Sequence, residues 1–117
     1  MAHDRFTFEG LEVFQVAREA LALTIAEKPG LRGLPGELAP QLESALLSVV
    51  NNIAEGAGRE SRAEQKRHYA FARGSACEAG AALIIAELYG TIAVERNLAI
   101  RSRLVRVAQM LSAMIRR

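Results

Sequence analysis

The chain has 117 residues, the length of a single domain, and its 15 Lys and Arg against 13 Asp and Glu give a net charge of only +2. Half of its residues are apolar and 5% are aromatic; a composition rich in Ala, Leu, Glu and Arg favours helices, because straight-chain residues lose little rotamer freedom in a helix. The single cysteine, Cys77, excludes an intramolecular disulfide and a thiolate zinc cluster.

The N-terminal residues MAHDRFTFEG lack the apolar core of a signal peptide, and no apolar stretch reaches the roughly 18 residues of a membrane-spanning helix. We therefore expect a cytoplasmic protein without a membrane partner.

The first predicted helix covers about residues 8–27. Apolar residues at Leu11, Phe14, Leu21 and Ile25 recur on one helix face. The segment KPGLRGLPG follows, and its density of Pro and Gly predicts that this helix ends near Glu27.

The second predicted helix covers about residues 40–55. Pro40 suits the first helical position, where a missing N–H is not needed. An apolar stripe then runs through Leu42, Ala45, Val49 and Ile53.

The third predicted helix covers about residues 61–89 and opens with a capping box, in which Ser61 and Glu64 satisfy free backbone N–H groups. Gly74 and Gly80 each destabilise a helix interior by about 1 kcal/mol relative to Ala. We therefore expect packing or function to compensate for them.

The fourth predicted helix covers about residues 92–116, with Leu104, Ala108, Leu111 and Ile115 on one face and Val107, Met110 and Met114 beside it. This wide apolar arc fits either a contact with another subunit or a well-buried helix of a monomer. The four segments together predict one all-α domain over residues 1–117, an antiparallel up-down-up-down four-helix bundle.

The stretch NNIAEGAGRESRAEQ, residues 51–65, contains the glycines of a possible phosphate loop. Such a loop needs a preceding strand and a following Lys-Ser or Lys-Thr, and this stretch has neither. We interpret it instead as a helix joint, in which Gly56 and Gly58 end one helix and Ser61 caps the next.

No catalytic, metal or cofactor site can be nominated, and we expect a protein that is not an enzyme. The two histidines are His3, near the terminus, and His68, which we expect to be solvated on a charged helix face. No Glu is followed by His at the third position as in di-iron bundles. Among small residues, Cys77 is expected to be a buried, inert thiol.

Two carboxylates lie near apolar helix faces. Glu55 and Glu78, together with Asn52 and Ser75, are predicted to form a hydrogen-bonded set that fixes the packing of the second and third helices. An acid/base pair is the less favoured alternative.

The charge is divided unevenly along the chain. Residues 1–58 carry four basic and eight acidic side chains, a balance of −4, and residues 59–117 carry eleven basic and five acidic side chains, a balance of +6. This asymmetry fits an anionic partner such as nucleic acid. It fits equally a surface whose halves compensate within one fold or between subunits.

Two motifs resemble those of a known family, the bacterial four-helix bundle proteins encoded in 23S rRNA intervening sequences, which are related to accessory proteins of diversity-generating retroelements. FEGLEVFQVA resembles the opening F-x-x-L-x-V-W-Q-x-A, with Phe14 in place of Trp. QLESALLSVVNNIAEGAGRESRAEQKRHYAFARGSACEAGAAL resembles the central signature NIAEG-x-GR, S-x-x-E and GS-x-x-E. The signature residues are Asn52, Glu55, Gly56, Gly58, Ser61, Glu64, Gly74, Ser75 and Glu78.

The resemblance implies a homopentameric barrel without catalytic residues or cofactors. It also implies binding of RNA or ribosome-associated nucleic acid, and for some members a protein partner such as a reverse transcriptase. The family usually has two basic residues after Gln-Leu in the second helix, where this chain has Glu43 and Ser44. Any contribution of those positions to nucleic-acid binding is missing here.

The remaining basic residues lie on the third and fourth predicted helices. Arg96, Arg103, Arg106 and Arg117 fall within about 80° around the fourth helix, at 100° per residue. We expect nucleic acid to be bound through a basic surface formed by Arg59, Arg62, Lys66, Arg67, Arg73, Arg96, Arg103, Arg106 and Arg117. The alternative is a homo-oligomeric scaffold that binds proteins and no nucleic acid.

Overall fold

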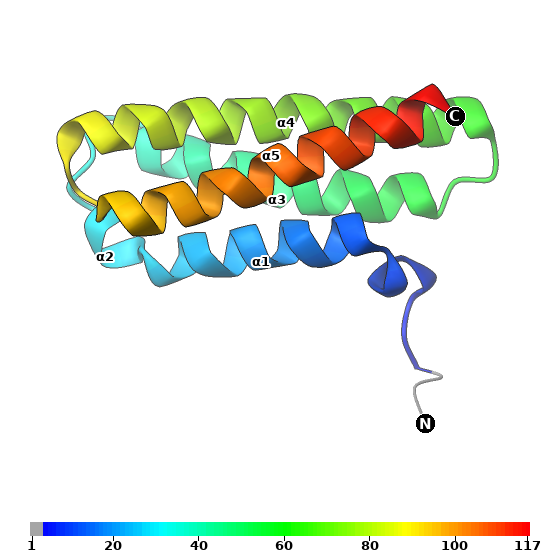
Figure 1. The fold of residues 1–117 in the computed structure, drawn as a ribbon, viewed down its shortest axis with the longest axis horizontal. Helices are drawn as coiled ribbons and strands as arrows, with labels where there is room; N and C mark the ends of the chain where they lie inside the picture. The colour runs from blue at the N-terminus through cyan, green and yellow to red at the C-terminus, as the bar shows by residue number, and fades with distance from the viewer. Residues whose placement is uncertain (1–3) are drawn as a thin grey trace.

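The computed structural model describes residues 4–117 and shows a bundle of four long helices (Figure 1). The long helices are α1 (Glu12–Ala26), α3 (Leu38–Ala57), α4 (Arg62–Tyr89) and α5 (Val94–Arg116). A 3-10 turn, η1 (Thr7–Gly10), precedes them, and the one-turn helix α2 (Lys28–Leu31) follows α1. No strand occurs within the described residues, which confirms the all-α prediction.

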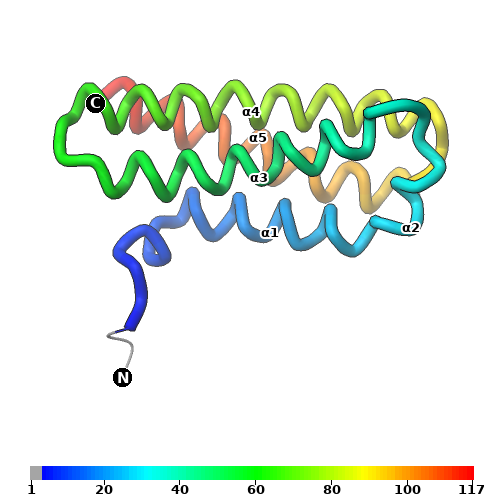
Figure 2. Tube along the Cα trace, turned by 180° about the vertical axis from the view of Figure 1, so that it is seen from behind, coloured from blue at the N-terminus to red at the C-terminus, as the bar shows by residue number. Residues whose placement is uncertain are grey.

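The four long helices alternate in direction. Helix α1 packs against α3 and α5, and α4 packs against the same two helices from the opposite side, so α1 and α4 lie diagonally across the bundle (Figure 2). The joint between α3 and α4 and the C-terminus of α5 lie at one end, and α2 and the joint between α4 and α5 lie at the other. This arrangement determines which charged residues meet.

The first predicted helix, residues 8–27, is divided at Leu11, whose extended backbone separates η1 from α1. The division has a packing reason, because η1 folds back and places the ring of Phe8 4.8 Å from that of Phe14. The backbone N–H of Phe6 also donates to the Glu9 carboxylate at 2.7 Å. Helix α1 ends at Ala26, close to the predicted end.

The Pro- and Gly-rich segment after α1 still forms one helical turn, α2. Gly30 lies so close to the joint between α4 and α5 that a Cβ atom there would stand 2.3 Å from the Thr91 carbonyl oxygen. Because Gly30 has no Cβ atom, α2 can pack against the joint between α4 and α5 and cover this end of the bundle.

Helix α3 begins at Leu38, two residues before the predicted start, so Pro40 occupies its third position. The reason that Pro is tolerated is unchanged, because N–H groups throughout the first turn lack intrahelical acceptors. The expectation that Gly56 ends this helix is wrong. Gly56 lies inside α3 and is buried, and Gly58 is the C-cap, whose N–H donates to the Ala54 and Glu55 carbonyls.

The core is formed by large aliphatic side chains, mostly from α3 and α5, and by many small side chains from α4. Leu42, Leu46 and Ile53 of α3 and Ile100 and Leu111 of α5 are fully buried. The buried face of α4 is made mostly of alanine, at positions Ala72, Ala76, Ala79, Ala82 and Ala86. The small-residue stretch noted in the sequence thus lets α3 and α5 approach α4 closely.

The buried Tyr69 of α4 packs against Gly56 and makes stability sensitive to alkaline pH. Burial raises the pKa of the phenol above its ordinary value of 10.0, and the positive charge of Arg62 partly offsets the effect. Tyrosine in the unfolded chain ionises near pH 10. The stability that the neutral folded phenol contributes is therefore complete below that pH and is lost as pH rises toward the folded pKa.

Replacing Tyr69 with Phe should flatten this alkaline loss. Between about pH 9 and pH 11, the free energy of unfolding from urea titrations should fall more steeply for the wild-type protein than for Tyr69→Phe. Equal slopes for the two proteins would show that Tyr69 ionises alike in the folded and unfolded chain.

Candidate nucleic-acid interface

The glycine-containing stretch forms the joint between α3 and α4. Ser61 is the N-cap of α4, and its Oγ accepts a hydrogen bond from the Glu64 N–H at 3.1 Å. The Glu64 carboxylate lies 3.5 Å from the same Oγ. The side-chain amide of Gln65 donates to the Arg59 carbonyl at 2.9 Å and closes the turn. These contacts are those of a helix joint rather than a phosphate loop.

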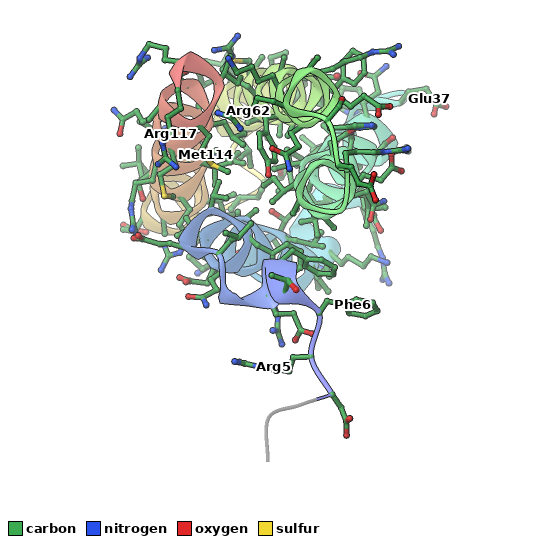
Figure 3. All side chains as sticks on the ribbon, turned by 90° about the vertical axis from the view of Figure 1, so that its right-hand side faces the viewer. Arg5, Phe6, Glu37, Arg62, Met114 and Arg117 are labelled. Carbon is green, nitrogen blue, oxygen red and sulfur yellow. The ribbon has the colours of Figure 1, made fainter. Side chains whose placement is uncertain are left out.

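Both arginines of this joint have partners within the protein. Arg59 pairs with Glu55 one helical turn earlier, at 3.3 Å. The Arg62 guanidinium reaches across the end of the bundle and donates to the Met114 and Arg117 carbonyls at the C-terminus of α5 (Figure 3). Because the last carbonyls of a helix lack intrahelical donors, Arg62 caps α5.

A polar network connects α3 and α4 behind the joint. The Ser48 and Ser75 hydroxyls lie 2.7 Å apart, and the Asn52 amide donates to the Ser48 carbonyl at 3.0 Å. His68 Nδ1 lies 3.1 Å from Asn52 Oδ1 and 3.4 Å from the Glu55 carboxylate. The structure thus brings together Asn52, Glu55 and Ser75 as predicted.

Two members of this network were not foreseen from the sequence, and one predicted member lies elsewhere. Ser48 gave no signal beyond its spacing of one turn from Asn52. His68 is not solvated as expected, since its side chain is only 17% exposed. Glu78 is exposed on α4, and none of the hydrogen bonds or ion pairs found among the described residues connects it with the network.

Three carboxylates of α1 pair with three arginines of α5 and form an interhelical ladder. Arg106 contacts Glu12 at 2.8 Å, Arg103 contacts Glu19 at 3.1 Å, and Arg96 pairs with Glu27. Arg101 of the same helix contacts Glu87 of α4 at 3.1 Å. The predicted basic stripe on α5 is therefore largely neutralised. Acidic residues from the first half of the chain compensate basic residues from the second half within the fold.

The ion pairs of this ladder should contribute unequally to the free energy of unfolding. Glu27 is only 8% exposed, so replacing Arg96 with Met leaves a buried carboxylate without its cation and should destabilise the protein by about 1–3 kcal/mol. Arg106 and Glu12 are both well exposed, and Arg106→Met should cost less than about 1 kcal/mol. Urea denaturation of the two variants measures the difference; equal losses would contradict it.

Several basic residues gather at one end of the bundle, which faces the viewer in Figure 3. Among the described residues, Lys66, Arg67, Arg116 and Arg117 have no carboxylate within ion-pair distance. Arg18 of α1 and Arg32 beside α2 also have no carboxylate within ion-pair distance, but they lie elsewhere in the described chain. We define the basic end as Arg59, Arg62, Lys66, Arg67, Arg116 and Arg117. Glu55, Glu60 and Glu64 lie at the same joint, so six cations and three carboxylates leave side-chain charge of +3.

Several exposed apolar side chains lie on α4 and α5, mostly toward the opposite end of the bundle. Leu88 is 82% exposed. We define the apolar face as Ile84, Ile85 and Leu88 of α4 with Leu98 and Val105 of α5, all at least 42% exposed. The wide apolar arc predicted for α5 is mostly absorbed within the protomer, since Val107 is buried and Met110 and Met114 pack against the core.

Residues 4–117 contain no cluster of three or more His, Cys, Asp or Glu side chains placed to hold a metal ion. His3 lies outside the described residues.

Cys77 is exposed, so the expectation of a buried thiol is wrong. It lies on α4 between the buried Ala76 and Ala79. Within the described chain, no helix has the length and apolar character to cross a membrane.

Comparison with known proteins supports the fold and gives the family. A solved structure from Bacteroides thetaiotaomicron VPI-5482, described as a protein with unknown function from the S23 ribosomal protein family, is similar with a TM-score of 0.73 and 19% sequence identity. The similarity covers 87% of this chain and 99% of that one. No curated protein matches the chain. The profile of the 23S rRNA-intervening sequence proteins matches residues 9–113, and the chain therefore belongs to that family.

Proposed function

We propose that the protein is a cytoplasmic, non-enzymatic homo-oligomer that binds RNA or another structured nucleic acid through the basic end. The observation that carries the proposal is the grouping of Lys66, Arg67, Arg116 and Arg117 without carboxylate partners, while the arginines of the ladder are neutralised. The name of the family, which refers to 23S rRNA intervening sequences, supports RNA as the ligand.

Self-association is supported by the apolar face. Side chains such as Leu88 and Ile85 contribute little to the protomer core, and a second copy that covers them would remove apolar surface from water. The family resemblance predicts five copies in a ring, in which each protomer uses two different surfaces. A ring repeats the +3 of the basic end around its axis, so a modest cluster becomes an extended positive surface.

Binding to phosphates through Lys and Arg should be sensitive to salt and largely independent of base sequence. Fluorescence anisotropy with a labelled hairpin RNA at about 50 mM and about 200 mM salt should show affinity that falls by tenfold or more as salt rises. Absence of binding even at the lower salt concentration would refute the proposal.

A protein-binding scaffold is the second candidate, favoured by a specific observation. The ladder removes three arginines from the available basic surface, and Glu43, at a position that is usually basic in relatives, pairs with Lys28 at 3.7 Å. Capture of a defined protein partner, such as a reverse transcriptase, from nuclease-treated lysate, together with no affinity for hairpin RNA, would support the scaffold.

A further inference from the structure

A groove between α4 and α5 adjoins the basic end and has a volume of about 410 Å³. Its walls are formed by Arg73, Cys77, Ala108, Gln109, Ser112 and Arg116. We propose that this groove binds a phosphate group, either of a nucleic-acid backbone or of a free oligophosphate. The backbone case rests on the proposed function, whereas the free oligophosphate case does not.

The groove carries two arginines and no carboxylate. Arg73 comes from α4 and Arg116 from α5, so their guanidinium groups belong to opposite walls. Every arginine of the ladder faces a carboxylate, and this pair does not. Guanidinium groups suit phosphate because their planar N–H donors match its oxygens in pairs. The charge of the groove thus selects an anion.

The polar side chains of the groove are also suited to a phosphate. The Ser112 hydroxyl accepts a hydrogen bond from Arg73 at 3.1 Å, which holds the guanidinium at the groove wall in advance of any ligand. The Gln109 amide offers further N–H donors. Ala108 and Cys77 are small and leave the space open between the two helices. Preorganised donors reduce the ordering that binding requires.

The position of the groove connects it with the basic end. Arg116 belongs to both, and α4 carries Lys66 and Arg67 about two turns before Arg73. A nucleic-acid strand that contacts the basic end can therefore continue into the groove along α4 and α5. Arg73 is among the residues predicted to bind nucleic acid, whereas the position of Arg116 on the facing wall is visible only in the structure.

Cys77 makes the proposal directly measurable. It is the only cysteine of the chain and is exposed on the groove wall, so the rate of its alkylation by iodoacetamide reports on this one location. A phosphate held between Arg73 and Arg116 covers the thiol. The test compares this rate for the full chain alone, with saturating hairpin RNA and with tripolyphosphate. Fluorescence anisotropy is used separately to measure RNA binding.

The expected result is that RNA and tripolyphosphate each slow Cys77 alkylation at least fivefold, and that Arg116→Gln and Arg73→Gln abolish this protection. For each variant, the alkylation rate with ligand is compared with the rate of the same variant without ligand. This is needed because the loss of a nearby cation can itself change the alkylation rate of the thiol. Arg116 is exposed, so Arg116→Gln remains informative even if loss of the Arg73 contact to Ser112 affects folding.

The two proposals fail in different ways. RNA that binds by anisotropy while neither ligand protects Cys77 overturns the groove and leaves the proposed function standing. Protection by tripolyphosphate without RNA binding supports the groove as an oligophosphate site and overturns the proposed function. Protection that persists in both arginine variants shows that the ligand lies elsewhere and overturns the groove.

Discussion

Replacing Ile85 and Leu88 together with Glu should convert the oligomer into a folded monomer. These side chains are 42% and 82% exposed in the protomer, so the bundle itself loses little packing. In the assembly the same change places two carboxylates in an apolar contact. Truncating a residue at the centre of an interface can weaken binding by about 2 kcal/mol or more. Two such changes should therefore raise the dissociation constant of the assembly by about a thousandfold or more.

Light scattering measures the mass of the assembly, and circular dichroism verifies that helix content is unchanged. Ile25→Glu is a matched control, because Ile25 is 51% exposed on α1, diagonally opposite α4. This control should retain the mass of the wild-type assembly. A wild-type protein that is already monomeric, or an equal loss of mass in Ile25→Glu, would contradict the assignment of the apolar face.

Replacing Gly56 with Ala should destabilise the protomer by about 1–3 kcal/mol, although Ala is the better helix former. A Cβ atom on Gly56 would lie 2.7 Å from Cε1 and 2.9 Å from Cδ1 of the Tyr69 ring, and 3.1 Å from the Cβ of His68. Tyr69 is only 4% exposed, so its ring has little room to move. The helices α3 and α4 must therefore separate locally.

Gly74→Ala is the matched control, since it introduces the same methyl group into a helix interior. Within the protomer no atom lies within 4 Å of a Cβ placed on Gly74. This variant should therefore stabilise the protomer by up to about 1 kcal/mol. Urea denaturation of both variants measures the effects, and a loss of stability in Gly74→Ala similar to that in Gly56→Ala would contradict the packing explanation.

Much of the fold follows from spacing along single helices. The stripe through Leu42, Val49 and Ile53 is buried as its period predicts, and Ser61 caps α4 as its position before a helix predicts. Local signals were weakest where the chain folds back on itself. The break at Leu11 accompanies the contact between Phe8 and Phe14, and Gly10 is the only local signal of it. An isolated glycine is tolerated within a helical pattern, so the sequence alone did not indicate a break.

The candidate interface was only partly predictable, because spacing shows which residues share a face but not what that face meets. Arg96, Arg103 and Arg106 do share one side of α5, as predicted. That side lies against α1, where Glu12, Glu19 and Glu27 neutralise it from 69 to 94 residues away in the chain. The spacings of seven and eight residues between these glutamates were the available signal of a second matching stripe.

The role of Gly56 was also missed for a physical reason. A glycine near a helix end is often a terminator, and the sequence cannot distinguish that role from close approach to a neighbouring helix. Here Gly58 is the cap, and Gly56 makes room for Tyr69. The exposed Gly74 and the partly buried Gly80 remain without a packing partner in the protomer.

The most direct test of the central claim compares two variants that lose the same charge from different surfaces. Lys66→Gln/Arg67→Gln removes two cations from the basic end, and Arg103→Gln/Arg106→Gln removes two from the ladder. In hairpin RNA titrations across a salt series, the first variant should bind at least tenfold more weakly, with a salt slope reduced by about 1.4–1.8. The second variant should stay within about threefold of the wild-type protein, because Glu12 and Glu19 already neutralise these arginines. If the ladder variant loses as much affinity as the basic-end variant, or the basic-end variant binds like the wild-type protein, the basic end does not bind the RNA.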